Sequence, residues 1–131
     1  MKRFLLIFSL VFTSMTGLFA QVDDPDDKNE RIQDKMNEFI QRQLKLSPEE
    51  SKKFSPVFLS YFKEWRRTLR ENKNDPLVRQ QKVVDLQLRY RTQFREIIGE
   101  DRGNQVFAYQ KLFIKELYDI QKKKRNTNVR Q

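Results

Sequence analysis

The chain has 131 residues, with 27 lysines and arginines against 18 aspartates and glutamates, and it contains neither cysteine nor histidine. This length suits a single domain. Without cysteine and histidine the chain has no disulfide, no Ser–His or Cys–His catalytic pair, and no zinc or copper site of the ordinary type. A glycine-rich phosphate-binding loop is also missing from the sequence. We therefore expect neither an enzyme nor a cofactor, and a fold held together by helix packing.

Residues 1–20 have the pattern of a cleavable signal peptide. Lys2 and Arg3 precede an apolar run over residues 4–12, and Ala20 stands where a signal peptidase would cut. A membrane-spanning helix needs about 20 apolar residues, roughly twice the length of this run. We predict cleavage near Ala20, export to the periplasm and no stable membrane insertion. In that compartment the positive charge favours anionic lipid, polyanions or unfolded acidic proteins as partners, and no nucleic acid.

The remaining chain divides by charge and by helical periodicity. Residues 21–27 are acidic and predict a solvated, disordered N-terminus. A calcium-binding loop is the alternative, but Pro25 interrupts the segment and no glycine follows at the required position. Residues 28–125 predict an all-helical domain, and residues 126–131 predict a disordered basic tail. Apolar residues at three- and four-residue steps indicate four amphipathic helices, the first over residues 27–44.

Helix boundaries follow from capping chemistry. Ser47 followed by Pro48 and Glu50 forms a capping box that starts the second helix. Asp75 and Pro76 start the third helix. Gly99 ends the third helix. The fourth helix is then expected to start within residues 101–103 and to run to residue 124. Its apolar residues cover more than one face, which suits either a helix buried on two sides or a dimer seam or client-binding groove.

Basic and aromatic residues alternate along the second and third helices. This pattern suits the binding of flexible, partly acidic chains, because long-range attraction speeds encounter and apolar contact then holds the partner. The alternative is that the arginines only make amphipathic helices soluble. The candidate binding residues are Leu59, Phe62, Trp65, Arg66, Arg67 and Arg70 on the second helix, and Arg89, Arg91 and Arg95 on the third.

Residues 44–61, which read LKLSPEESKKFSPVFLSY, resemble the first signature of the Spy/CpxP-like (LTxxQ-motif) family of periplasmic helical proteins, in its Bacteroidetes-type variant. The matching motif positions are Leu46, Ser47, Pro48, Glu50 and Phe54. A second copy of the motif is expected before the fourth helix, where the chain reads Ile98-Gly99-Glu100-Asp101-Arg102 and does not match.

The resemblance implies four helices in two helical hairpins and an antiparallel homodimer. It also implies a chaperone that holds unfolded or partly folded proteins without ATP. The alternative is a regulatory protein that binds an envelope sensor domain, linked to a sensor kinase or to a sigma factor of the extracytoplasmic type, and damps or senses envelope stress. A metal-sensing role is disfavoured by the absence of histidine and cysteine.

Overall fold

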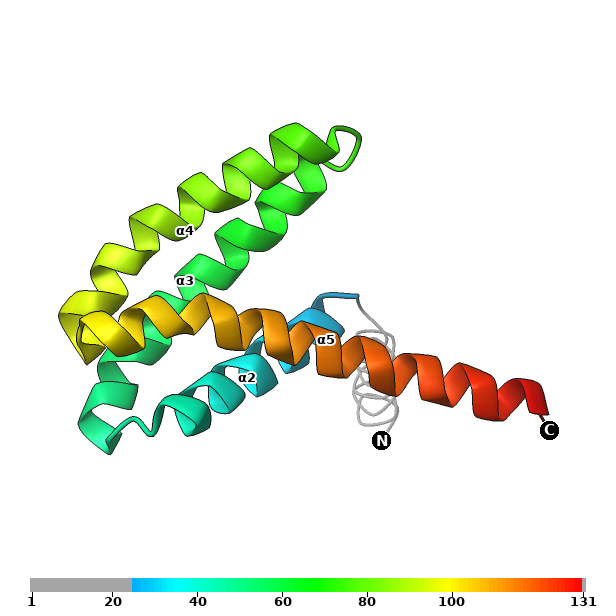
Figure 1. Cartoon of the computed structure of the whole chain (residues 1–131), viewed down its shortest axis with the longest axis horizontal. Helices are drawn as coiled ribbons and strands as arrows, with labels where there is room; N and C mark the ends of the chain where they lie inside the picture. Colours follow the sequence, from blue (N-terminus) through cyan, green and yellow to red (C-terminus); the bar gives the residue numbers. More distant parts are fainter. Residues whose placement is uncertain (1–24, 131) are drawn as a thin grey trace, which may run out of the picture. The chain divides into compact units, whose positions relative to one another are not determined.

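The computed structural model describes residues 25–130, and all of its regular structure is helical (Figure 1). The helices are α2 (Pro25–Leu44), α3 (Pro48–Glu71), α4 (Pro76–Ile98) and α5 (Glu100–Arg130). For residues 25–130, the prediction of an all-helical fold with four helices is therefore confirmed. The predicted signal peptide, its cleavage near Ala20 and residues 21–24 of the acidic segment lie outside the described residues.

The predicted caps form as expected. The Ser47 hydroxyl accepts a hydrogen bond from the Glu50 amide at 3.2 Å, and the Glu50 carboxylate accepts one from the Ser47 amide at 3.0 Å. Asp75 accepts a hydrogen bond from the Val78 amide at 3.2 Å. Gly99 ends α4 with a φ of 90°, a left-handed conformation that favours glycine. These four residues explain where α3 and α4 begin and where α4 stops.

Three predicted boundaries are wrong. Helix α2 begins at Pro25, so residues 25–27 are helical where the sequence predicted disorder. Helix α5 begins at Glu100, directly after Gly99, and continues through the expected restart at residues 101–103. The same helix reaches Arg130, so residues 126–130 are helical where a disordered tail was predicted.

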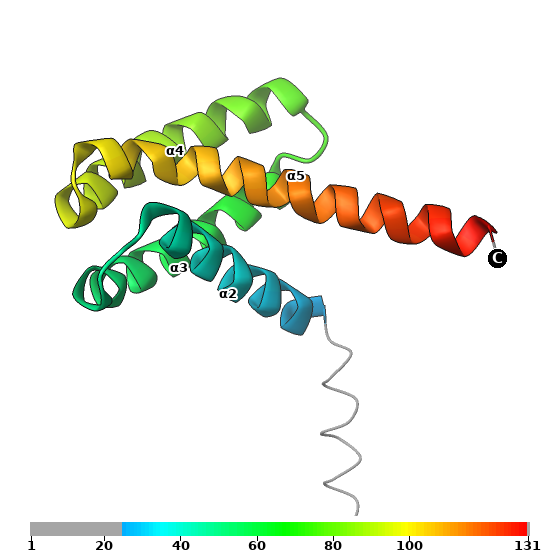
Figure 2. The same ribbon diagram turned by 60° about the horizontal axis from the view of Figure 1, so that its bottom comes forward.

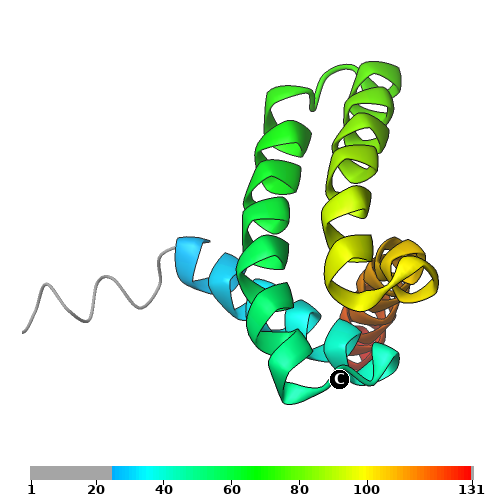
Figure 3. The same ribbon diagram turned by 90° about the vertical axis from the view of Figure 1, so that its left-hand side faces the viewer.

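Residues 35–130 form one compact unit, and the start of α2, up to Asp34, belongs to a second unit. Within the larger unit, α3 and α4 lie side by side and run antiparallel, joined by the short turn over residues 72–75 (Figures 1 and 3). Helix α5 packs against α4. The second half of α5 extends beyond α3 and α4 (Figure 2).

The core of this unit is aromatic, and Tyr61 lies where three helices meet. Its ring centroid is 5.4 Å from that of Tyr90, 6.1 Å from that of Phe94 and 5.4 Å from that of Phe107. The Tyr61 hydroxyl donates a hydrogen bond to Gln110 at 2.6 Å and accepts one from Gln87 at 3.2 Å. The other buried apolar side chains of residues 35–131 are Met36, Ile40, Leu44, Phe54, Phe58, Phe62, Leu86, Ile98 and Val106.

Candidate binding surface

Trp65, Arg66, Leu69 and Arg70 line a shallow depression on α3, which we call the Trp65 surface. The apolar stripe of α3 is buried at Phe58 and emerges at Trp65 and Leu69, which are both half-buried. The Trp65 ring stays anchored to the core through Phe62, with ring centroids 5.6 Å apart. Arg66 and Arg70 follow Trp65 and Leu69 directly in sequence, so the two guanidinium groups form a row beside the apolar row.

Phe62 does not belong to this surface. Its side chain is 1% exposed, so the prediction of Phe62 as a client-binding residue is wrong for the folded protein. Leu59 is half-buried, one turn before Phe62. The signal that separates them is the helical step: Phe62 lies four residues after Phe58, on the buried stripe, and Leu59 does not.

Arg67 of α3 and Arg89 of α4 lie near the Tyr90 hydroxyl and the Glu64 carboxylate. An ion pair of 3.8 Å joins Arg67 and Glu64. Burial raises the pKa of Tyr90 to about 12; the Glu64 carboxylate adds to this rise, and the charges of Arg89 and Arg67 oppose it. Arg67 is therefore engaged with Glu64 of its own helix, and Arg89 acts on the neighbouring Tyr90 hydroxyl.

Arg91 and Arg95 lie on a different side of α4 from Arg89, because residues two positions apart point in nearly opposite directions on a helix. Arg95 donates a hydrogen bond to the side chain of Asn104 at 2.7 Å and so takes part in the crossing of α4 and α5. The predicted arginine clusters are thus each divided by the fold. Of the candidates, only Arg66 and Arg70 frame an apolar depression together with Trp65.

The motif residues behind the family resemblance form a structural junction. Arg102 of α5 pairs with the Glu50 carboxylate, with Nη1 and Oε1 3.1 Å apart. Arg102 also donates to the carbonyl of Ile98 at 3.0 Å and to that of Leu44 at 3.5 Å. The Arg102 guanidinium and the Ser47 amide hold the pKa of Glu50 below its usual range. The remaining motif positions are structural too, since Phe54 is fully buried and Leu46 is half-buried.

This role of Arg102 was not found from the sequence. Glu50 and Arg102 are 52 positions apart, and nothing in either segment indicates the pairing. The junction connects the end of α2, the start of α3, the end of α4 and the start of α5 through one side chain. It is an architectural element, and its donors and acceptors are already engaged with each other.

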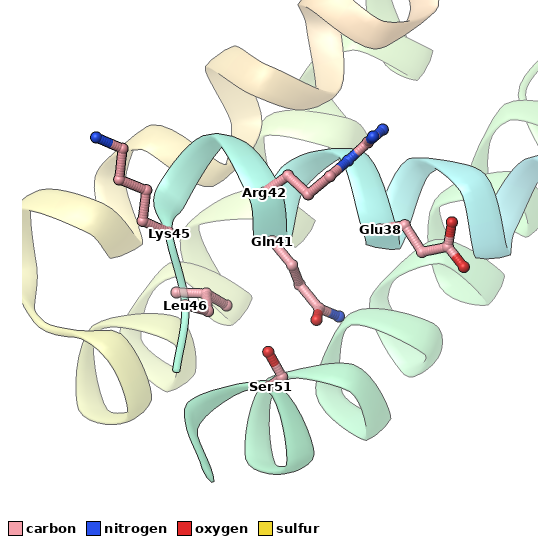
Figure 4. A pocket seen from close by; sticks show the side chains of 6 residues that line it. All are labelled: Glu38, Gln41, Arg42, Lys45, Leu46 and Ser51. Carbon is pink, nitrogen blue, oxygen red and sulfur yellow. The ribbon is translucent and has the colours of Figure 1, made fainter. Parts of the chain in front are cut away.

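A second depression lies at the corner between α2 and α3 (Figure 4). The side chain of Gln41 points toward α3, where it donates a hydrogen bond to Ser55 at 2.9 Å, and it donates another to Asn37 of its own helix α2 at 2.7 Å. The amide group is thus engaged with the protein itself. The remaining side chains of the depression are Glu38, Arg42, Lys45, Leu46 and Ser51, a mixture of both charges without a common chemistry.

Among residues 25–130, no three His, Cys, Asp or Glu side chains gather in a way that could hold a metal ion. In the same part of the chain, no helix is both long and apolar enough to cross a membrane. Comparisons of the chain with models of protein families, with curated proteins and with solved structures gave no match.

Proposed function

We propose that this protein is a periplasmic, ATP-independent holdase that binds unfolded or partly folded proteins through the Trp65 surface. The observation that supports this function is the pairing of a half-exposed indole ring and Leu69 with two guanidinium groups in one depression. Unfolded chains expose apolar side chains together with carboxylates and backbone carbonyls. Trp65 and Leu69 suit the first group, and Arg66 and Arg70 suit the second.

The charge of the whole chain supports the same function kinetically. The full chain has a net charge of +9, and loss of Lys2 and Arg3 with the predicted signal peptide would leave +7. This positive charge attracts acidic segments of a client before any contact is made. Apolar contact with Trp65 then slows dissociation. Such a site needs no reaction and no nucleotide, because binding alone keeps the apolar segments of clients from associating with each other.

The finer architecture implied by the resemblance belongs to this proposal. Two helical hairpins and an antiparallel homodimer would place two Trp65 surfaces on one particle, so that one client chain could be held at two points. Two linked sites bind a long flexible chain more tightly than either does alone. A solution mass measurement of the purified protein tests the dimer directly.

The function is tested by light scattering of an aggregating client, with the purified protein added without ATP. Arg66→Gln/Arg70→Gln should weaken the suppression of aggregation by roughly tenfold, since the two exposed cationic contacts together contribute about 1–2 kcal/mol. The matched control is Lys52→Gln/Lys53→Gln, which removes the same charge from exposed positions of the same helix. Suppression that is absent at stoichiometric amounts, or lost equally in both variants, would refute the proposal.

A pull-down from envelope extracts addresses the regulatory alternative. A holdase should recover many proteins in small amounts, and Arg66→Gln/Arg70→Gln should reduce them together. A single stoichiometric partner that is retained by this variant would instead favour binding of an envelope sensor domain.

A further inference from the structure

The second half of α5 has two unlike sides, and its inner side faces the protein. Phe113 lies against Phe39 of α2, with ring centroids 5.6 Å apart, and Leu117 is half-buried one turn later. From Lys111 to Val129, all side chains except those of Phe113 and Leu117 are exposed. The helix therefore presents about five turns of surface that the described residues leave uncovered.

One stripe of this exposed surface carries cations and apolar groups without any acid. We define the outer face of α5 as Lys111, Ile114, Lys115, Tyr118, Lys122, Arg125 and Val129. Successive members of the row 111–114–118–122–125–129 lie three or four positions apart, so they share one side of the helix, and Lys115 lies beside them. Tyr118 is 60% exposed and Val129 is 86% exposed.

The acidic groups of this segment lie beside the outer face, roughly 110° round the helix from its middle. Glu116 and Asp119 belong to the row that runs from Leu112 to Lys123 in steps of four, three and four positions. Asp119 lies four positions after Lys115 and three before Lys122, so it borders the outer face. Glu116 lies further from this face. Here the outer face has four cations, three apolar side chains and no carboxylate, so the face complements an anionic surface.

We propose that the outer face of α5 docks on an anionic phospholipid surface. Lysine and arginine reach phosphate headgroups with their charged ends while their methylene stems lie along apolar material. Ile114, Tyr118 and Val129 lie among these cations along the helix. A helix that lies in the plane of a membrane inserts apolar side chains of this kind just below the headgroups. The outer face of α5 is a binding surface separate from the Trp65 surface, and the proposed membrane binding does not depend on the holdase function.

The charges disfavour a second copy of this chain as the occupant. Two outer faces brought together would place four cations of one copy against four of the other with no carboxylate between them, and like charges in such a contact cost several kilocalories per mole. A membrane surface carries only the complementary sign. It also takes up a long row of side chains along one side of a helix.

The test is sedimentation of the full chain with vesicles of phosphatidylcholine and phosphatidylglycerol in equal parts, and with vesicles of phosphatidylcholine alone. The apolar residues 4–12 are the same in every variant, so differences between variants report on α5. Lys122→Gln/Arg125→Gln should weaken binding to the anionic vesicles roughly tenfold or more, because each cation near an anionic surface contributes independently. Added salt should weaken the binding of the unmodified chain.

Two matched controls come from the same segment. Lys123→Gln/Lys124→Gln removes the same charge from neighbouring residues that are not part of the outer face. Its change in the logarithm of the dissociation constant should be less than half that of Lys122→Gln/Arg125→Gln. Ile114→Ser should weaken binding, and Leu112→Ser should not, although the two side chains are 38% and 39% exposed. Far-ultraviolet circular dichroism should be the same for all variants, since every replaced side chain is exposed.

Three results would overturn the proposal. Binding to the anionic vesicles that Lys122→Gln/Arg125→Gln leaves unchanged would show that the outer face does not recognise anionic headgroups. Equal losses in the two double variants would show attraction by total charge without a specific face. Polyglutamate that binds the chain and displaces it from anionic vesicles through the same four cations would assign the face to an acidic protein instead.

Discussion

Replacement of Gly103 by alanine tests the crossing of α4 and α5 more sharply than any other single change. Gly103 is buried inside α5, where alanine would ordinarily be the better helix former. A Cβ atom at this position would lie 2.8 Å from the backbone nitrogen of Arg95 and 2.9 Å from its Cα atom. The obstacle is therefore backbone of α4, which cannot move away as a flexible side chain can.

The magnitude follows from two opposing effects. Alanine in place of glycine inside a helix stabilises it by about 1 kcal/mol. Overpacking of a tight contact costs about 1–3 kcal/mol, and the upper end applies where backbone must shift. We expect a net loss of about 2 kcal/mol in the free energy of unfolding, because the clash involves two backbone atoms of Arg95 as well as its Cγ atom.

The assay is urea denaturation followed by circular dichroism, with Gln105→Gly as the control. Gln105 is exposed in the same turn of α5, so glycine there should cost about 1 kcal/mol through helix propensity alone. Helix propensity alone predicts that Gly103→Ala gains stability and that Gln105→Gly loses it. The close approach of Arg95 to Gly103 predicts that both variants lose stability. A Gly103→Ala protein as stable as the unmodified chain would show that α4 and α5 do not approach this closely.

Three further changes test the connections between helices. Ser47→Ala should lower the free energy of unfolding by about 1 kcal/mol in the same urea assay, because it removes half of the capping box. Arg102→Met should flatten the acid side of the stability–pH profile. The lowered pKa of Glu50 stabilises the fold at pH values above 4.5, the pKa of this group in the unfolded chain, and the stabilisation is lost as the pH falls from 4.5 through the pKa in the folded protein. An unchanged acid limb would contradict the pairing of Arg102 with Glu50. Tyr61→Phe should cost about 1–3 kcal/mol, because Gln110 stays buried without its donor. Burial raises the pKa of Tyr61 from 10.0 to about 12, so stability should fall as the pH rises through this range, and Tyr61→Phe should reduce that fall.

The boundaries of α3 and α4 were predictable because their causes are local. Ser47, Asp75 and Gly99 act on backbone groups within four positions, so their chemistry can be inferred from the sequence alone. The second half of α5 was mispredicted for the opposite reason. The polar composition of residues 126–130 favours disorder in isolation, but a helix that already exists extends at little cost.

The site was predicted only in part. Trp65, Arg66 and Arg70 do line one depression together with Leu69. Trp65 and Leu69 are four positions apart, as are Arg66 and Arg70, so each pair shares one side of α3 whatever the rest of the chain does. The division between Arg89 and Arg91 follows from the same geometry and was available from the sequence. The engagement of Arg95 with Asn104 was not, since it depends on how α5 crosses α4.

The free half of α5 shows how a surface can be ordered with little core beneath it. An isolated helix of this length is marginal in water because its first turn is costly to form. In this chain the packed half, with Gly103 against α4 and Val106 fully buried, provides that first turn. Each later residue adds one backbone hydrogen bond, and Thr127 adds a side-chain bond to the carbonyl of Lys123 at 2.9 Å. The direction in which the outer face of α5 is presented therefore depends on the α4–α5 crossing, so the contact at Gly103 governs both the fold and the proposed membrane-docking geometry.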